Sequence, residues 1–233
     1  MKKSHPWTFV YCVTIVAVLL LAQWGSRAVT VLAESAPIVR KHCIIIDAGH
    51  GGVDGGTTSY SGVLESGYNL AIAKRLNDLM QFLGYETKMV RTEDISVYKA
   101  GETIAQKKSS DLKERVRMVN EEEDGVLISI HQNHYPDERY KGAQVFYAKT
   151  SGSEELAKAL QASFSATINP GNKREVRKSS GVYLMEHIVR PGVLIECGFL
   201  SNPAEDAMLK TPEYQKKLCT VIGATVSQFL SNT

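Results

Sequence analysis

The sequence predicts a single α/β domain built on a mainly parallel, twisted sheet of about six strands with helices on both faces. Two observations carry this prediction. Short apolar runs alternate with longer amphipathic stretches along the chain, as in βαβ units. Three of the apolar runs lead to a side chain that can do chemistry, namely His50, His131 and Glu196. Ligands of parallel sheets bind beyond the carboxyl ends of the strands, so we expect these three side chains in one site.

The first residues of the chain have the features of an export signal. Two lysines at the start precede an apolar stretch from Trp7 to Ala22, and the pattern Val31-x-Ala33 fits a cleavage site. The apolar stretch is shorter than the roughly 20 residues that a membrane span needs. We therefore expect residues 1–36 to be a cleaved signal peptide rather than a retained membrane anchor. Either outcome exports the domain formed by residues 37–233 across the cytoplasmic membrane.

The first half of the domain contains two strands and two helices in this interpretation. Cys43–Ile46 is a strand buried on both faces, because an acid and a glycine-rich turn bound a continuous apolar run. A helix with an apolar stripe follows from Tyr68 to Leu83, and Glu86–Val90 forms the second strand. Residues 92–110 are polar and are expected to be a mobile excursion. Asp111 begins a capping box, so the next helix is expected from there to Glu123.

The second half continues the alternation. The third strand is expected to end at His131, and the alternating run Ala143–Ala148 is the fourth strand. Ser153 is expected to cap a helix that reaches Ile168. A basic polar loop over residues 169–180 then leads to the apolar run at residues 182–185.

The C-terminal part has clear helix signals. The strand that ends at Glu196 is followed by Asn202 and Pro203, which fit the cap and first position of a short helix. Thr211 and the proline after it open a last helix, expected to reach Phe229. No internal repeat and no second domain are found in the sequence.

Charge and cysteine content exclude several classes of function. The formal net charge of +2 and the lack of a long basic run argue against a nucleic-acid partner. The cysteines are Cys12, in the export signal, and Cys43, Cys197 and Cys219 in the domain. Cys43 and Cys197 lie in apolar runs and are interpreted as small buried hydrophobes. The absence of CxxC spacing argues against a zinc–thiolate site.

A glycine-rich loop links His50 to Glu65 and can fold that acid back over the same strand end. His50, Glu65 and His131 would then form a His-Glu-His set with an open fourth position, as in catalytic zinc sites. Two histidines and a carboxylate can also hold iron. Zinc would lower the pKa of its water to about 7. Glu196 would then accept a proton and pass it to the leaving amine.

Other interpretations of these residues remain open. Histidines at strand ends are often hydrogen-bonded structural residues. The stretch GHGGVDGG could bind phosphate, although it has neither GxGxxG order nor a Walker lysine. His134 could compete with His131 as a ligand or face the substrate. Arg174, Arg177 and Lys178 are typical of a solvated face, although acidic wall polymers could use them.

Six blocks of the chain resemble, in order, the zinc-dependent N-acetylmuramoyl-L-alanine amidases of the amidase type 3 family. They are DAGHGGVDGG, LESGYNLAIAKRL, RTED, SIHQN, GAQVFY and PGVLIECGFLSNPAE. The resemblance implies one Zn²⁺ held by His50, Glu65 and His131, a catalytic Glu196, and Asn133 facing the substrate. Two departures are visible. Ala48 replaces the usual proline of DPGHGG, and His134, a tentative second substrate contact, stands where a small residue is usual.

Within that family, KGAQVFY and GVYLMEHIVRPGVLIECGFLSNPAE are most similar to the germination-specific, spore-cortex members. This resemblance implies removal of stem peptides from peptidoglycan glycan strands, the step before muramic δ-lactam formation in the cortex. A monomer is expected, with an unknown accessory sporulation protein as a further partner. Three alternatives stay open: a vegetative autolysin with the same chemistry, another zinc peptidoglycan peptidase, and a non-catalytic wall-binding module.

Overall fold

The computed structural model describes residues 42–232, so the expected export signal lies outside the described residues. A six-stranded sheet forms the centre of the domain, in the order β2-β1-β3-β6-β4-β5. Every neighbouring pair is parallel except β4 with β6. This confirms the mainly parallel sheet. The strands are β1 (Cys43–Ala48), β2 (Glu86–Met89), β3 (Gly125–Asn133), β4 (Gln144–Tyr147), β5 (Arg177–Lys178) and β6 (Gly192–Phe199).

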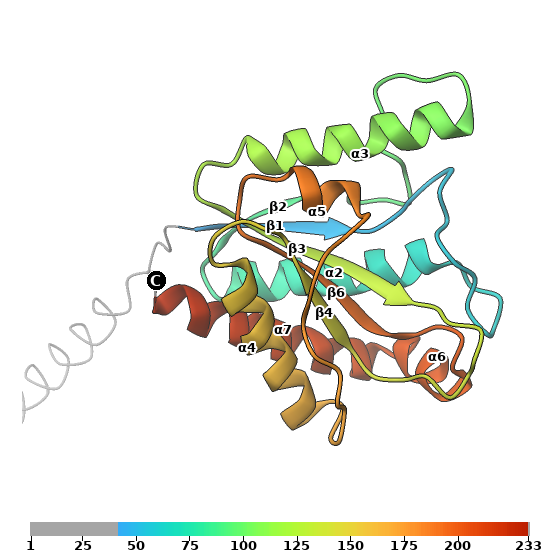
Figure 1. The fold of residues 1–233 in the computed structure, drawn as a ribbon, viewed down its shortest axis with the longest axis vertical. Coiled ribbons are helices and arrows are strands. Elements are labelled where there is room, and N and C mark those ends of the chain that lie inside the picture. The colour runs from blue at the N-terminus through green and yellow to red at the C-terminus, as the bar shows by residue number, and fades with distance from the viewer. Residues whose placement is uncertain (1–41, 233) are drawn as a thin grey trace, which may run out of the picture. The chain divides into compact units, whose positions relative to one another are not determined.

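Helices cover both faces of the sheet, as the alternation of apolar and amphipathic segments predicts (Figure 1). One face carries α2, α4 and α7, and the other carries α3 and α5. None of the helices described is long and apolar enough to cross a membrane. The helices are α2 (Glu65–Phe82), α3 (Ile104–Asn120), α4 (Ser153–Thr167), α5 (Tyr183–His187), α6 (Pro203–Leu209) and α7 (Pro212–Ser231).

The sheet has an apolar core on each side. Ile44 and Ile46 of β1 belong to the larger cluster with α2, α4 and α7, whereas Ile45 between them belongs to the smaller cluster on the opposite face. Strands buried on both faces need apolar residues at every position, and this explains the continuous apolar run in the sequence of β1. Cys43 and Cys197 are buried and form no disulfide within residues 42–232, in agreement with their interpretation as small hydrophobes.

The start of α3 differs from the sequence prediction. The helix begins at Ile104, so the second part of the expected mobile excursion is helical. Thr103 and Gln106 form the capping box, while the side chain of Asp111 accepts a hydrogen bond from the backbone of Val97. The first two turns of α3 are largely exposed and need no apolar stripe, because only the later part of the helix packs against the sheet. Apolar periodicity therefore could not reveal them.

Smaller corrections concern the ends of other elements. Helix α2 begins three residues before the expected start, at Glu65. The N-cap of α4 is Gly152 rather than Ser153, whose hydroxyl instead accepts a hydrogen bond from Gly192 at the start of β6. The basic loop contains strand β5, and the apolar run after it forms α5. The expected caps of α6 and α7, Asn202 and Thr211, both accept hydrogen bonds from backbone amides.

Candidate metal centre and active site

The turn after β1 is shaped by close contact with a histidine of β3. A Cβ atom on Gly49 would lie 2.2 Å from Nε2 of His131, so only glycine allows the ring to pack there. The next residue, His50, has a φ angle of 61°. This is the left-handed backbone conformation, which residues other than glycine seldom adopt. This turn brings the two imidazoles together, with ring centroids 5.0 Å apart.

Two buried arginines hold this turn in place. Arg91 donates to the carbonyl of Gly49 at 2.9 Å, and Arg115 donates to the carbonyl of His50 at 2.7 Å. Arg115 also forms a buried ion pair with Asp47 at the end of β1. Burial alone would raise the pKa of Asp47, but the positive charge of Arg115, the charge of His131 and hydrogen bonds from Ser129 and Arg115 together outweigh burial and lower that pKa. The carboxylate therefore stays charged and fixes the arginine.

Glu65, the first residue of α2, lies between the two histidines. Its Oε2 is 3.3 Å from Nε2 of His50, and its Oε1 is 3.1 Å from Nδ1 of His131. Burial opposes charge on both His50 and Glu65, yet their hydrogen bonds raise the pKa of His50 to about 9 and lower that of Glu65. The three predicted ligands thus form one tightly coupled cluster at the carboxyl ends of β1 and β3.

Further hydrogen bonds orient Glu65. Asn69, one helical turn along α2, donates to Oε1 at 3.1 Å, and so does the backbone amide of Gln132. The backbone amide of Thr57 donates to Oε2 at 3.1 Å. The carboxylate is only 5% exposed. These contacts leave it little freedom to rotate.

His50 is oriented by a chain of charged groups. Oδ2 of Asp54 lies 3.1 Å from Nδ1 of His50, and Nζ of Lys108 in α3 lies 2.8 Å from the other carboxylate oxygen. A carboxylate on the remote nitrogen of a metal-binding imidazole fixes the tautomer and the ring orientation. Asp54 is therefore placed to leave Nε2 of His50 free for a metal.

The cluster fits a zinc ion. Each residue offers one ligand atom, and these atoms lie within 4.8 Å of one another. Ligands about 2.0–2.1 Å from a tetrahedral zinc are roughly 3.3 Å apart, and each histidine lies at about that distance from one of the two oxygens of Glu65. The set of two imidazole nitrogens and one carboxylate oxygen is the one found in zinc hydrolases. Among the described residues it is the one group that meets these criteria.

Glu196 lies beside this cluster on β6. It is paired with His131 across the β3–β6 ladder, which places both side chains on the same face of the sheet. Its Oε2 is buried without a hydrogen-bond partner in residues 42–232, and burial raises the pKa of Glu196 to about 7. Such a carboxyl group can accept and release a proton near neutral pH.

A cavity of about 330 Å³ opens in front of these groups. His50, His131 and Glu196 form one wall of it. Helix α3, α5 and the loop before it also line the cavity, with apolar side chains such as Leu112, Val182 and Leu184 and with the charged side chains of Lys108, Asp111 and Arg115. A substrate group that enters this cavity reaches the candidate metal ligands and Glu196 together.

Comparison with known proteins identifies the family. The model of the N-acetylmuramoyl-L-alanine amidases, amidase type 3, matches residues 44–228. The chain belongs to this family. It is therefore an N-acetylmuramoyl-L-alanine amidase that acts on peptidoglycan, as the sequence blocks predict.

Three known amidases are similar to this chain. The amidase is 34% identical to the germination-specific N-acetylmuramoyl-L-alanine amidase of Bacillus subtilis, covering 95% of this chain and 93% of the relative. It is 30% identical to the amidase LytC of the same organism, over 80% of this chain but 35% of LytC. The structure of the CwlD amidase from Clostridioides difficile in complex with the GerS lipoprotein is 36% identical, with a TM-score of 0.79 and coverage of 83% of this chain and 100% of the other.

The two tentative substrate contacts lie at the end of β3. In the amidase, Asn133 is half-buried where the β3–β6 register shifts, and His134 is exposed beyond it. Neither lines the cavity in front of Glu196. The His134 side chain makes no hydrogen bond within residues 42–232, whereas His131 contacts Glu65 directly, so the geometry favours His131 as a ligand.

The sequence interpretation missed Asn69, Arg91 and Arg115, which orient the site of the amidase. Asn69 had a usable signal, because it follows Glu65 by four residues and so faces it along a helix. The two arginines had none. A buried arginine cannot be told from a surface arginine without knowing which carbonyl groups face it.

Proposed function

We propose that this amidase uses one zinc ion held by His50, Glu65 and His131, with Glu196 as the group that moves the proton. The observation that carries the proposal is the unpartnered, buried Oε2 of Glu196 next to three converging ligand atoms. A buried polar oxygen without a partner is costly unless something else engages it. A water or substrate group between Glu196 and the metal would do so.

Each group has a defined task in the proposed reaction. Zinc supplies Lewis-acid polarisation of the scissile carbonyl and lowers the pKa of a water molecule. Glu196 takes a proton from the attacking water and delivers it to the alanine nitrogen as the amide bond breaks. The products are a muramic acid with a free lactyl carboxylate and a peptide that begins with L-alanine.

Mass spectrometry of muropeptides tests this reaction. We expect the full-length protein to release peptides beginning with L-alanine from glycan strands, to stop when a chelator is added, and to recover with Zn²⁺. Glu196→Gln should keep one zinc per chain and lose about 10²–10⁴-fold in turnover, because glutamine cannot accept the proton. The exposed Glu138→Gln is the matched control and should keep normal turnover. Cleavage between two peptide residues would contradict the proposal.

We further propose that the amidase is exported and works on the spore cortex before muramic δ-lactam is formed. Its alignment over nearly the full length of the germination-specific relative supports this role over that of a vegetative autolysin, since LytC extends well beyond the matched part. The GerS complex of the CwlD relative supports an accessory lipoprotein for this chain too. A cortex with normal δ-lactam in a deletion strain would exclude the cortex role.

A further inference from the structure

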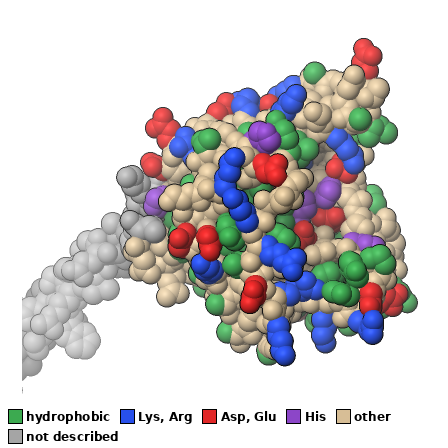
Figure 2. All heavy atoms as spheres, viewed as in Figure 1, with side chains coloured by type: hydrophobic (Ala, Val, Ile, Leu, Met, Phe, Trp, Pro, Cys, Tyr) green, Lys and Arg blue, Asp and Glu red, His purple; other side chains and the backbone are tan. Residues whose placement is uncertain are grey.

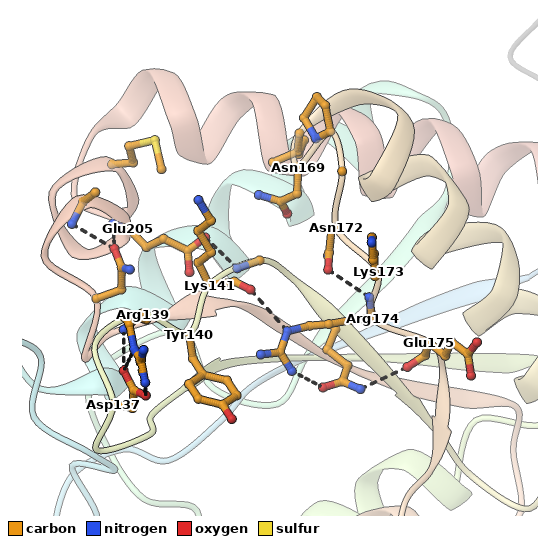
Figure 3. A pocket seen from close by; sticks show the side chains of 18 of the residues that line it. Asp137, Arg139, Tyr140, Lys141, Asn169, Asn172, Lys173, Arg174, Glu175 and Glu205 are labelled. Atoms are coloured by element: carbon orange, nitrogen blue, oxygen red, sulfur yellow. Dashed lines mark hydrogen bonds and ion pairs between the residues drawn. The ribbon is translucent and has the colours of Figure 1, made fainter.

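A second cavity, of about 1080 Å³, is larger than the one in front of Glu196 and is lined by other residues (Figure 3). Its walls come from the segment after β3, the loop between α4 and β5, and the start of α6. The walls carry five Lys or Arg residues and three acids. Figure 2 shows Lys and Arg side chains gathered on the lower half of the same face. The proposed reaction does not use any residue of this cavity.

The cavity is connected to the active site through one row of the sheet. His131 on β3 is paired with Glu196 on β6, and Glu196 is paired in turn with Gln144 on β4. Gln144 lines the cavity and accepts a hydrogen bond from Nη1 of Arg174 at 3.1 Å. A row of neighbouring side chains therefore leads from the candidate metal ligands into the cavity. It consists of His131, Glu196, Gln144 and Arg174.

Arg174 is fixed in one orientation inside this cavity. Its Nε donates to the carbonyl of Lys141 at 3.2 Å, and its guanidinium lies 4.5 Å from the ring centre of Phe199 and 5.7 Å from that of Tyr140. Figure 3 shows it in the middle of the labelled side chains, near Tyr140. A guanidinium held by stacking loses little freedom when it binds a ligand.

The charge of Arg174 is not neutralised by the part of the protein that the structure describes. No carboxylate lies within ion-pair distance of it in residues 42–232. Glu205, the acid that acts on it most strongly, already accepts hydrogen bonds from the backbone amides of Gly142 and Phe199. Asp137 of the same cavity is paired with Arg139. Nη2 of Arg174 makes no hydrogen bond within residues 42–232 and can bind an incoming anion.

We infer that Arg174 binds the free α-carboxylate on the second residue of the stem peptide that the enzyme releases. This inference rests on the proposed amidase reaction at Glu196. The cavity is a peptide subsite in this arrangement, and the smaller cavity in front of Glu196 takes the muramoyl group.

Distance selects the second residue. Neighbouring strands lie about 4.8 Å apart, and the Arg174 guanidinium lies one side chain beyond β4, so it is roughly 10 Å from Glu196. A carboxylate hydrogen-bonded to it would be about 3 Å closer to Glu196. The remaining distance of about 7 Å matches two extended residues of about 3.3–3.6 Å each. A charged group on the alanine itself would not reach Arg174.

Calorimetry with released peptides tests the subsite without any need for turnover. The probes are L-alanyl-γ-D-glutamyl-L-lysine amide with a free glutamyl α-carboxylate and the same peptide with that carboxylate amidated. We expect the full-length, zinc-loaded protein to bind the acidic peptide at least about tenfold more tightly, since hydrogen bonds between charged groups contribute that much or more. Arg174→Ala should abolish this preference, and Arg174→Lys should keep part of it.

Two further comparisons test the role of Arg174 separately from the proposed amidase function. Arg139→Gln changes a cation of the same cavity that is already paired and should keep the full preference. In hydrolysis of the matching muramoyl peptides, we expect Arg174→Ala to raise KM for the acidic substrate. The KM for the amidated substrate should stay unchanged. Equal binding of both peptides by the wild-type protein would overturn the inference. Failure of the wild-type protein to cleave either substrate would instead overturn the proposed function.

Discussion

The geometry of the site depends on two consecutive residues after β1. Gly49 must lack a side chain because the ring of His131 occupies that space, and His50 must adopt a left-handed conformation to turn its ring towards Glu65. Such a conformation costs roughly 1–3 kcal/mol and persists only when surrounding contacts enforce it. The buried hydrogen bonds from Arg91 and Arg115 to this turn are those contacts.

Gly49→Ala therefore tests the proposed metal site without changing any of the three proposed ligands. A methyl group 2.2 Å from Nε2 of His131 must displace that ring, so we expect zinc content to fall well below one per chain. The control is Gly67→Ala on α2, where a Cβ atom meets nothing within 4 Å and alanine favours the helix. Elemental analysis and circular dichroism measure the two effects. Full zinc content in folded Gly49→Ala would show that His131 is not a ligand.

Part of this arrangement could be predicted from individual residues. His50, His131 and Glu196 each follow an apolar run, so the end of a parallel strand was their expected position. For Arg174 the sequence indicates a solvated face or a contact with acidic wall polymers, because a basic residue in a polar loop has no sequence feature that indicates stacking on Phe199. That contact depends on a side chain brought in from a distant strand.

Helix α3 links the outer part of the molecule to the candidate ligands. Its Lys108 contacts Asp54, which contacts His50, and its Arg115 binds the turn itself. The first two turns of the helix are exposed and held by the capping box at Thr103 rather than by packing. The predicted start at Asp111 rests on a capping-box pattern inside the helix, whereas the capping box in the structure is formed by Thr103 and Gln106 ahead of turns that carry no apolar stripe.

Thr103→Ala tests the contribution of this cap. Loss of a threonine N-cap typically costs about 1 kcal/mol, and we expect that decrease in the free energy of unfolding measured with urea. Faster amide hydrogen exchange should be confined to the first turns of α3. Ser109→Ala, an exposed substitution within the same helix, is the control and should leave stability unchanged or slightly higher. An equal effect of both substitutions would argue against the capping box.

At the scale of the whole molecule, the alternation of apolar runs and amphipathic stretches was enough to predict a two-sided, mainly parallel sheet. The direction of β4 and the position of β6 were not predictable in the same way. Ala143–Ala148 alternates regardless of whether its neighbour is parallel or antiparallel. The insertion of β6 between β3 and β4 depends on pairing between segments far apart in the sequence.

A protein that starts at residue 37 should fold without the residues before it. The sheet begins at Cys43, and residues 42–232 supply an apolar core on each of its faces. We expect residues 37–233 to give a monomer with one cooperative thermal transition and the circular dichroism of the longer chain. Size-exclusion chromatography and a melting curve measure this. Aggregated material with exposed apolar surface would mean that residues 1–36 pack on the fold.

The place of β6 in the sheet also bears on how the chain reaches its final form during synthesis. Strands β3 and β4 are consecutive, and β3 can pair with β1 at once, but the facing edges of β3 and β4 must wait for their common neighbour, which is made about 45 residues after β4. A nascent chain that ends before residue 192 contains the three candidate ligands but neither Glu196 nor the strand that joins the two halves of the sheet. An incomplete chain could therefore bind a metal without being able to cut the cell wall.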